Sequence, residues 1–268
     1  MRKDHDALEG HRARRQFGQN FLVDERILRE ILAITDPRPG QRIVEIGAGL
    51  GALTAGLLAG GADVTAIEID RDLLPRLERR FGADPRFMLL ARDALQVDFR
   101  TLAAGGKLRV VGNLPYNISS PLLLHLLDAL DVIDDATVML QHEVAARLAA
   151  APHCADYGRL GIAIQACCRV DLVLAVPPES FEPVPKVDSS VVRLTPLSNA
   201  PSSALRAALG RITQQAFSLR RKVVRHSLGR LFDDAQLASC GIDSRQRPEE
   251  ITVEQYLALA RMATAAAP

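Results

Sequence analysis

The four-residue segment Asn113-Leu114-Pro115-Tyr116 carries the strongest chemical signal in the sequence. Pro115 keeps Leu114 out of the helical region and fixes an extended turn. Such a turn can aim two acceptors, the side-chain oxygen of Asn113 and the carbonyl oxygen of Leu114, at one point. Two acceptors at one point suit an exocyclic amine, and the ring of Tyr116 can stack on the base that bears it. Such a site could prepare a weakly nucleophilic amine for direct attack on an electrophilic group, accelerated by positioning and electrostatics.

Phe181 is a second candidate aromatic residue. It lies in the Pro-rich stretch 176–186 and lacks the alternating apolar neighbours of a core strand. We therefore expect an exposed ring that stacks on the opposite face of the base. Chemistry on a nucleic-acid base requires the base to leave its stack, so two aromatic faces would hold it.

A glycine-rich segment, residues 45–52, joins a predicted strand to a predicted helix. Glycines there let the backbone turn tightly and approach a ligand, and the start of the helix offers free N–H groups. Gly47, Gly49 and Ala52 fit the relaxed dinucleotide fingerprint, and Glu68 lies where a ribose-binding acid belongs. The same layout fits S-adenosyl-L-methionine (SAM), and a purely structural turn is the third interpretation.

Two further carboxylates bear on this choice. Asp93 ends a predicted strand, where it can accept the amino hydrogens of an adenine. Glu45 precedes the glycines, and its negative charge would favour a cationic cofactor over a pyrophosphate. Together with Glu68, these two carboxylates lie at the carboxyl ends of successive predicted strands. In an open α/β sheet those ends form the ligand-binding edge. The three acids favour SAM over a dinucleotide.

The elements that must position these residues alternate along the first 199 residues. Apolar runs typical of strands recur at 42–48, 62–70, 87–93, 108–115 and 137–144. Helical patterns separate them, and one helix is expected to begin with Ser120 as N-cap and Pro121 at its first position. This alternation predicts an α/β fold, a Rossmann-like parallel sheet with helices on both faces. The runs 171–176 and 189–196 are expected to form an antiparallel pair at the sheet edge.

A domain boundary is predicted in the polar, Pro-bearing segment 195–203. Residues 1–199 form the expected α/β domain, in which residues 1–15 should be mobile. Residues 200–268 show only helical patterns and predict a small all-α domain. This second part carries 10 basic and 6 acidic residues, whereas the first carries 23 and 26. Its run of basic residues between 206 and 230 suits the phosphates of an anionic polymer.

Composition excludes several classes of protein. With 48% hydrophobic and 24% charged residues, the chain can bury a core, and wholesale disorder is excluded. We find no apolar run of the roughly 18 residues that a membrane span needs, and no apolar segment of a secretory signal. The four cysteines lack zinc-ligand spacing, so no metal site is expected. These observations predict a soluble cytoplasmic protein.

Six short motifs follow one another along the chain. They are F-G-Q-N-F-L at 17–22, E-I-G-A-G-L-G at 45–51, E-I-D at 68–70, D-A at 93–94, N-L-P-Y at 113–116 and F-E-P-V-P-K-V-D-S-S-V at 181–191. Together they resemble the ribosomal RNA adenine N6-dimethyltransferases. The likeness continues through 216–232 and 247–260, which look more like the bacterial small-subunit (16S) enzymes than the large-subunit enzymes of macrolide resistance.

The resemblance implies a SAM-dependent enzyme that dimethylates the N6 amines of two adjacent adenines near the 3′ end of small-subunit ribosomal RNA. Such a reaction is linked to maturation of the small subunit. The cofactor-binding residues that the resemblance implies are Asn20 and Leu22 closing over SAM, Gly47 at its methionine part, Glu68 at the ribose, Asp93 at the adenine amine, and Asn113 between cofactor and target.

The resemblance also implies partners and a division of labour. Residues 1–199 would be the SAM-binding catalytic domain, and 200–268 the domain that binds RNA or the ribosome. The expected RNA contacts are Arg220, Arg221, Lys222 and Arg225, with Arg12, Arg14 and Arg15 near the N-terminus. The partner would be small-subunit ribosomal RNA in a subunit or its precursor. The protein would act as a monomer, without a membrane or a metal.

Three alternatives stay open. An NAD-linked oxidoreductase would need a proton relay, yet none of the three tyrosines has a lysine four residues later. A non-catalytic ribosome-assembly factor would use the fold only to bind RNA. A large-subunit adenine N6-methyltransferase of the macrolide-resistance type would share the catalytic motifs but not the C-terminal segments.

Overall fold

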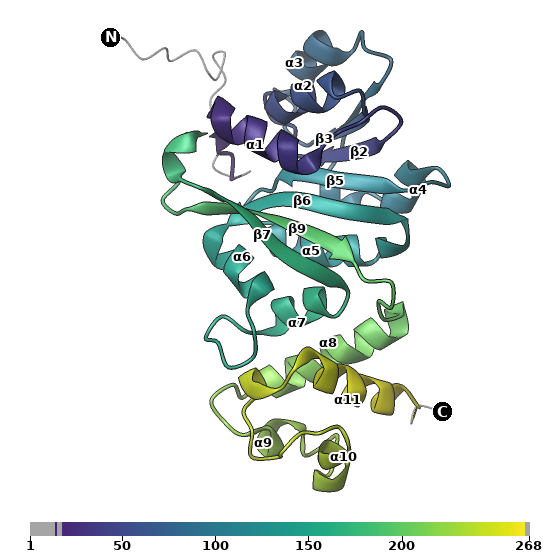
Figure 1. The fold of residues 1–268 in the computed structure, drawn as a ribbon, viewed down its shortest axis with the longest axis vertical. Coiled ribbons are helices and arrows are strands. Elements are labelled where there is room, and N and C mark those ends of the chain that lie inside the picture. The colour runs from purple at the N-terminus through teal and green to yellow at the C-terminus, as the bar shows by residue number, and fades with distance from the viewer. Residues whose placement is uncertain (1–13, 15–17, 266–268) are drawn as a thin grey trace. The chain divides into compact units, whose positions relative to one another are not determined.

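The computed structural model describes Arg14 and residues 18–265, which form two compact units (Figure 1). The first unit comprises the described residues up to Ala145 together with Asp171–Thr195. The second comprises Ala146–Val170 and the residues from Pro196 onward. The predicted mobility of residues 1–15 falls outside the described residues, apart from Arg14.

Within the described residues, a seven-stranded sheet forms the centre of the first unit, in the order β4-β3-β2-β5-β6-β9-β7. The strands are β2 Arg42–Ile46, β3 Asp63–Glu68, β4 Phe87–Ala91, β5 Leu108–Asn113, β6 Ile133–Gln141, β7 Cys168–Val176 and β9 Ser189–Pro196. The strands from β4 to β6 in this order pair in parallel, whereas β9 is antiparallel to β6. The chain reverses its winding between β2 and β5, where open α/β sheets bind ligands.

The strand predictions are confirmed by this sheet. The apolar runs of the central strands β2, β5 and β6 are largely buried, and Ile43, Val44 and Ile46 of β2 are each only 1% exposed. Continuous burial is expected of parallel strands that are covered on both sides. The two late strands, β9 and β7, are neighbours at one end of the sheet, where β7 is the outermost strand.

Helices flank the sheet, with α1 in front of it and α5 behind it in the view of Figure 1. They are α1 Glu25–Thr35, α2 Ala52–Ala59, α3 Leu74–Phe81, α4 Phe99–Ala103, α5 Ser119–Leu127 and α6 His142–Ala149. The predicted cap of α5 is wrong, because Ile118 is the N-cap and Ser119 the first helical residue. Pro121 therefore lies third in the helix, still in the first turn, where a missing N–H breaks no helical hydrogen bond.

A separate two-stranded sheet joins the N-terminal segment to the Pro-rich stretch. Strand β1 (Phe21–Leu22) pairs antiparallel with β8 (Phe181–Glu182), and Leu22 lies opposite Phe181. The Phe181 ring packs into the hydrophobic core and is 2% exposed. The prediction of an exposed Phe181 is therefore wrong, because pairing with β1 covers a strand too short to show alternation.

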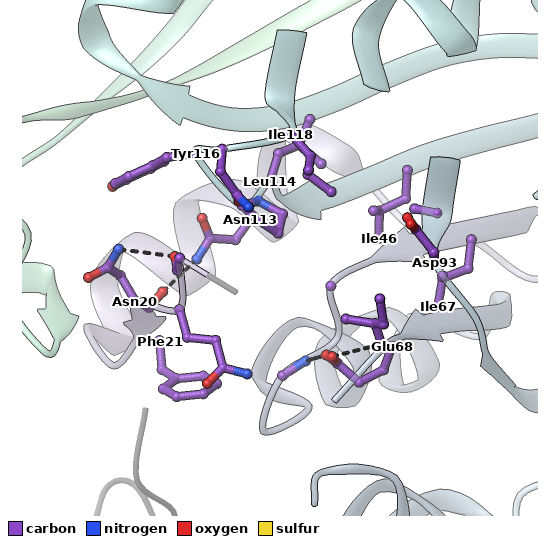
Figure 2. A pocket seen from close by; sticks show the side chains of 18 of the residues that line it. Asn20, Phe21, Ile46, Ile67, Glu68, Asp93, Asn113, Leu114, Tyr116 and Ile118 are labelled. Carbon is purple, nitrogen blue, oxygen red and sulfur yellow. Dashed lines mark hydrogen bonds between the residues drawn. The ribbon is translucent and has the colours of Figure 1, made fainter. Parts of the chain in front are cut away.

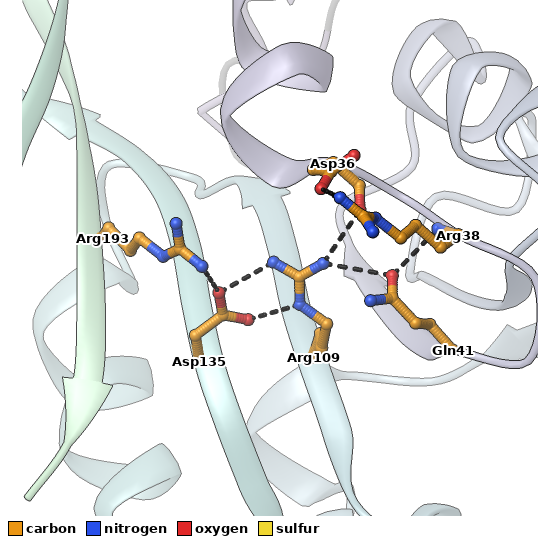
Figure 3. Close-up of polar contacts among 6 residues, drawn as sticks. All are labelled: Asp36, Arg38, Gln41, Arg109, Asp135 and Arg193. Carbon is orange, nitrogen blue, oxygen red and sulfur yellow. Dashed lines mark hydrogen bonds and ion pairs between the residues drawn. The ribbon is translucent and has the colours of Figure 1, made fainter.

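An ion cluster centred on the buried Asp135 lies near the amino ends of β5 and β6 (Figure 3). Asp135 accepts hydrogen bonds from the Nε and Nη2 of Arg109 at 2.7 and 2.8 Å, and from Arg193 at 2.6 Å. Burial raises the pKa of Asp135, but the hydrogen bonds and charges of both arginines outweigh it and hold the pKa below its ordinary value. The cluster ties β5, β6 and β9 together at the edge opposite their site-bearing ends.

The second unit is helical, as predicted for the C-terminal part. Its helices are α7 Arg159–Gln165, α8 Ser203–Phe217, α9 Val224–Leu228, α10 Asp234–Ser239 and α11 Val253–Ala265. The buried hydroxyls of Tyr157 and Tyr256 donate to the carbonyl oxygens of Ile251 and Pro248, at 2.9 and 2.8 Å. The Tyr157 bond helps to explain why 146–170, which the sequence placed in the first domain, packs with this unit.

No helix in the described part of the chain combines the length and the apolarity needed to cross a membrane. No group of three or more His, Cys, Asp or Glu side chains there is arranged to hold a metal ion. Cys167 and Cys168 are buried free thiols, and burial raises the pKa of Cys167 to about 11, so it stays protonated.

Candidate functional site

A cavity of about 270 Å³ lies at the carboxyl ends of β2, β3, β4 and β5. The predicted site residues that line it are Asn20, Gly47, Glu68, Asp93, Asn113, Leu114, Pro115 and Tyr116. Figure 2 shows Glu68 and Asp93 at one end of this cavity, and Asn113 and Tyr116 toward the other. The sheet thus brings the predicted cofactor residues and the N-L-P-Y segment into one cavity.

Leu22 and Phe181 are not among the residues that line this cavity. Leu22 is 8% exposed and lines a small neighbouring cavity together with Glu45 and Asn113. Phe181 lies opposite it in the β1–β8 pair. The role of Leu22 in closing over a cofactor stays a prediction.

The apolar walls of the cavity were not predicted from the sequence. These walls are Phe21, Ile46, Ile67, Ile69, Ala94 and Ile118. Most of them directly precede or follow a predicted polar residue in the sequence. The neighbours of each predicted strand-end residue could therefore have been predicted to line the site. Apolar walls with a few polar groups suit the base and ribose of a nucleoside.

Glu68 is held in place by backbone N–H groups. Its Oε2 accepts from Gly49 at 2.8 Å, and its Oε1 accepts from Ile69 and Asp70 at 2.9 Å each. Burial raises the pKa of Glu68 above its ordinary value, although these N–H groups act in the opposite direction. A carboxylate fixed in this way suits the paired hydroxyls of a ribose.

Replacing Glu68 with alanine is expected to weaken SAM binding about 10- to 100-fold, because charge-assisted hydrogen bonds to the ribose are lost. The rate at saturating SAM should change little, since the N-L-P-Y segment is untouched. Calorimetry and a SAM titration of the rate measure the two effects. Glu68→Gln keeps an acceptor for the Gly49 N–H, so its SAM affinity should lie between those of the parent protein and Glu68→Ala. Unchanged affinity in Glu68→Ala would contradict a ribose role.

Gly47 and Gly49 shape the cavity by having no side chain. Gly47 has a φ of +74°, and a Cβ there would lie 3.4 Å from the carbonyl oxygen of Asn113. A Cβ on Gly49 would lie 3.2 Å from the ring of Phe21. Positive φ and close packing both favour glycine here. The loop therefore leaves space for a ligand beside the N-L-P-Y segment.

Asn113 is oriented by the N-terminal segment. Its Nδ2 donates to the carbonyl oxygen of Asn20 at 2.9 Å (Figure 2). This bond identifies Oδ1 as the acceptor end of the same amide. The N–H of Leu114 donates to the carbonyl oxygen of Met139 on β6 at 3.1 Å and fixes the start of the turn. The predicted acceptor at Asn113 therefore has a defined orientation.

The segment before β1 is held by Asp70, a carboxylate two residues beyond β3. The Nε2 of Gln19, which the sequence analysis did not single out, donates to Asp70 at 2.8 Å. Arg14 pairs with the same carboxylate at 3.1 Å. Arg14 thus contacts carboxylates here, and its predicted contact with phosphates stays a prediction; Arg12 and Arg15 lie outside the described residues.

Glu45 is buried beneath the glycine loop, where it is 1% exposed and accepts a hydrogen bond from the Thr54 hydroxyl. It lines the small neighbouring cavity rather than the main one. Burial raises the pKa of Glu45 to about 8. The group is therefore largely protonated at pH 7 when no cation lies beside it. The negative charge predicted at Glu45 therefore depends on a cation beside it, and its part in selecting a cationic cofactor stays a prediction.

Binding of a cationic cofactor is expected to release up to about one proton from Glu45 at pH 7. A nearby cation favours the ionised carboxylate, so the pKa falls on binding. Affinity should then rise with pH up to about 8, the pKa of Glu45, and level off above it. Calorimetry in buffers of different ionisation enthalpy measures the proton. Glu45→Gln should abolish this release, and release that persists would belong to another group.

Four of the residues predicted to contact RNA lie in the second unit. Arg220, Arg221 and Lys222 lie on the turn between α8 and α9, Arg225 lies on α9, and all four are exposed. The sequence predicted only helical patterns in 200–268, whereas these first three cations lie outside a helix and α9 begins only at Val224. Exposure on a turn suits contact with phosphates, and the contact itself stays a prediction.

Comparisons with known proteins agree with this geometry. The family model described as ribosomal RNA adenine dimethylase matches residues 10–265. The ribosomal RNA small subunit methyltransferase A of Pseudomonas aeruginosa is 48% identical over 255 residues, 94% of this chain and 95% of the relative. The protein of the same name from Methylibium petroleiphilum is 48% identical over 252 residues, 93% of this chain and 96% of the relative.

Solved structures share the fold. The crystal structure of the 23S rRNA methyltransferase ErmE is 26% identical, covers 91% of this chain and 100% of its own, and superposes with a TM-score of 0.71. A dimethyladenosine transferase from Plasmodium falciparum, 24% identical, covers 89% of this chain and 95% of its own with a TM-score of 0.78. The family match spans both units, and the chain therefore belongs to the ribosomal RNA adenine dimethylase family.

Proposed function

We propose that this protein transfers methyl groups from SAM to the N6 amines of two adjacent adenines near the 3′ end of small-subunit ribosomal RNA. One observation carries the proposal: Glu68, Asp93 and the N-L-P-Y segment line a single cavity. Membership of the family supports the reaction, and the names of relatives at 48% identity support the small subunit as the source of the RNA.

The residues of the cavity fit SAM. Glu68 offers a carboxylate for the ribose, and Asp93 offers one for the adenine amine. The absence of a side chain at Gly47 lets the methionine part approach the backbone. Asn20, and Leu22 in the neighbouring cavity, would close over the cofactor. When bound, SAM supplies an electrophilic methyl group on a positively charged sulfur.

The N-L-P-Y segment would prepare the target amine. The Oδ1 of Asn113 and the carbonyl oxygen of Leu114 accept its two N–H groups, which favours a pyramidal nitrogen with its lone pair directed at the methyl group. Pro115 fixes the turn, and Tyr116, which is half-buried, offers its ring to the base. Positioning and fixed acceptors supply the rate enhancement.

The proposed partner is small-subunit ribosomal RNA, in a ribosomal subunit or its precursor. The exposed cations of the α8–α9 turn would contact its phosphates. We propose a monomer that acts in the cytoplasm without a metal ion or a membrane. A large-subunit target is the second candidate, and the likeness to ErmE at 26% identity is the observation that favours it.

Methyl groups mapped by mass spectrometry on both ribosomal RNAs test the proposal. RNA from cells that lack the protein should lose two dimethyladenosines near the 3′ end of the small-subunit RNA, and they should return when the gene is restored. Adenine methylation that changes only on large-subunit RNA would favour the second candidate. Unchanged methylation of both RNAs would contradict catalysis and leave an assembly role.

A further inference from the structure

The D-S-S segment that opens β9 has no part in the proposed mechanism, yet it touches the N-L-P-Y segment. The hydroxyls of Ser189 and Tyr116 lie 2.8 Å apart and share a hydrogen bond. Ser189 is 1% exposed, whereas Tyr116 lines the cavity. Burial raises the pKa of Tyr116, so its phenol stays protonated near neutral pH. The bond thus joins a buried, fixed serine to an aromatic ring of the site.

Ser189 is fixed by the carboxyl end of β6. It lies opposite Gln141 in the antiparallel register of β6 and β9. His142, which follows Gln141 directly, donates its N–H to the carbonyl oxygen of Asp188 at 2.9 Å. The Nδ1 of His142 and the hydroxyl of Ser190 lie 3.0 Å apart and share a further hydrogen bond. These contacts leave the Ser189 backbone little freedom to shift.

Strand β6 also fixes the backbone on the Tyr116 side of the Ser189–Tyr116 hydrogen bond. Asn113 lies opposite Met139 in β6, and the N–H of Leu114 donates to the Met139 carbonyl oxygen. Tyr116 follows two residues later, so its side chain bridges from the end of β5 across β6 to β9. A ring anchored at its backbone and at its hydroxyl presents one defined face. Methyl transfer to a stacked base needs such a face, because small errors in position are costly.

We propose that Ser189 is a positioning residue of the methyl-transfer site, which anchors the Tyr116 hydroxyl and so fixes the ring face against which the target adenine stacks. The inference rests on the proposed function. Ser189 acts through Tyr116, so its loss should lower the turnover of RNA and leave SAM affinity unchanged.

The contact is tested first without cofactor or RNA. The chain has three tyrosines, so protein labelled with 3-fluorotyrosine should give three fluorine NMR signals, and Tyr116→Phe identifies the signal of Tyr116. Ser189→Ala should shift or broaden that signal alone. Ser190→Ala is the matched control, because Ser190 is equally buried and bonds to His142 instead. A Tyr116 signal that ignores Ser189→Ala, or responds equally to Ser190→Ala, would overturn the proposal.

Kinetics on small-subunit ribosomal RNA test the role. Ser189→Ala should lower kcat about 3- to 10-fold, as expected for one lost hydrogen bond, with SAM affinity by calorimetry unchanged. Tyr116→Phe keeps the ring but loses the hydroxyl that bonds to Ser189, so its kcat should match that of Ser189→Ala. The double variant should show no further loss, because both changes remove one interaction. Ser190→Ala should keep the parent rate.

The outcomes distinguish a failure of the Ser189 role from a failure of the proposed function. Additive losses in the double variant, or a lowered SAM affinity in Ser189→Ala, would overturn the positioning role. Absence of methyl transfer by the unaltered protein would overturn the proposed function, while the fluorine signals would still report the Ser189–Tyr116 contact. An active protein with an unmoved Tyr116 signal would remove only the role of Ser189.

Discussion

Asn113→Ala is expected to abolish methyl transfer, with a loss of at least about 10²–10³-fold in single-turnover rate. Donors or acceptors that stabilise a transition state commonly contribute this much. The variant removes the Oδ1 acceptor for the target amine and the bond from Nδ2 to Asn20. SAM binding should become weaker but remain measurable, because Glu68 and Asp93 are unchanged. Transfer of a radiolabelled methyl group to small-subunit ribosomal RNA measures the rate, and calorimetry measures SAM binding.

Asn117→Ala is a matched control for this prediction. Asn117 is an exposed asparagine that lines the same cavity four residues later, and its loss should leave most of the rate. Asn113→Asp is the more demanding variant, because it keeps oxygen acceptors but cannot donate to Asn20. A rate near that of Asn113→Ala would show that orientation by Asn20 matters as much as the acceptor. Near-normal turnover of Asn113→Ala would refute the acceptor role.

The strand ends that build the cavity could be predicted because each carries its signal locally. An apolar run ends at Ile46 before glycines, another ends at Glu68, and a third ends at Asn113 before a proline. Parallel pairing then places these ends at one edge of the sheet, whatever the details of packing. The chemistry of the site follows from residue types at those ends. This part of the site therefore needed no knowledge of long-range contacts.

The contacts that the sequence did not reveal join segments distant along the chain. The pairs Leu22–Phe181 and Tyr116–Ser189 depend on which short strand meets which, and periodicity does not specify this. Phe181 lacks alternation because its strand has two residues, so its burial is decided by its partner. The protonation of Glu45 likewise depends on desolvation by its surroundings rather than on its residue type.

The triple variant Arg220→Gln/Arg221→Gln/Lys222→Gln is expected to weaken binding of small-subunit ribosomal RNA by roughly 100-fold at moderate salt. Each phosphate contact contributes about 0.7–0.9 to the slope of log affinity against log salt, so three lost contacts should flatten the slope by about 2–3. SAM affinity should be unchanged, because the cofactor residues lie in the other unit. Filter binding over a range of salt concentrations measures affinity and slope together.

A second triple variant separates the place of the charges from their number. Arg245→Gln/Arg247→Gln/Arg261→Gln removes three other positive charges from the same unit, where Arg245 and Arg261 already pair with Asp243 and Glu254. Charges that a carboxylate neutralises attract phosphates weakly, so this control should bind RNA with nearly the parent affinity and slope. If both triple variants lost affinity equally, net charge rather than the α8–α9 turn would attract the RNA.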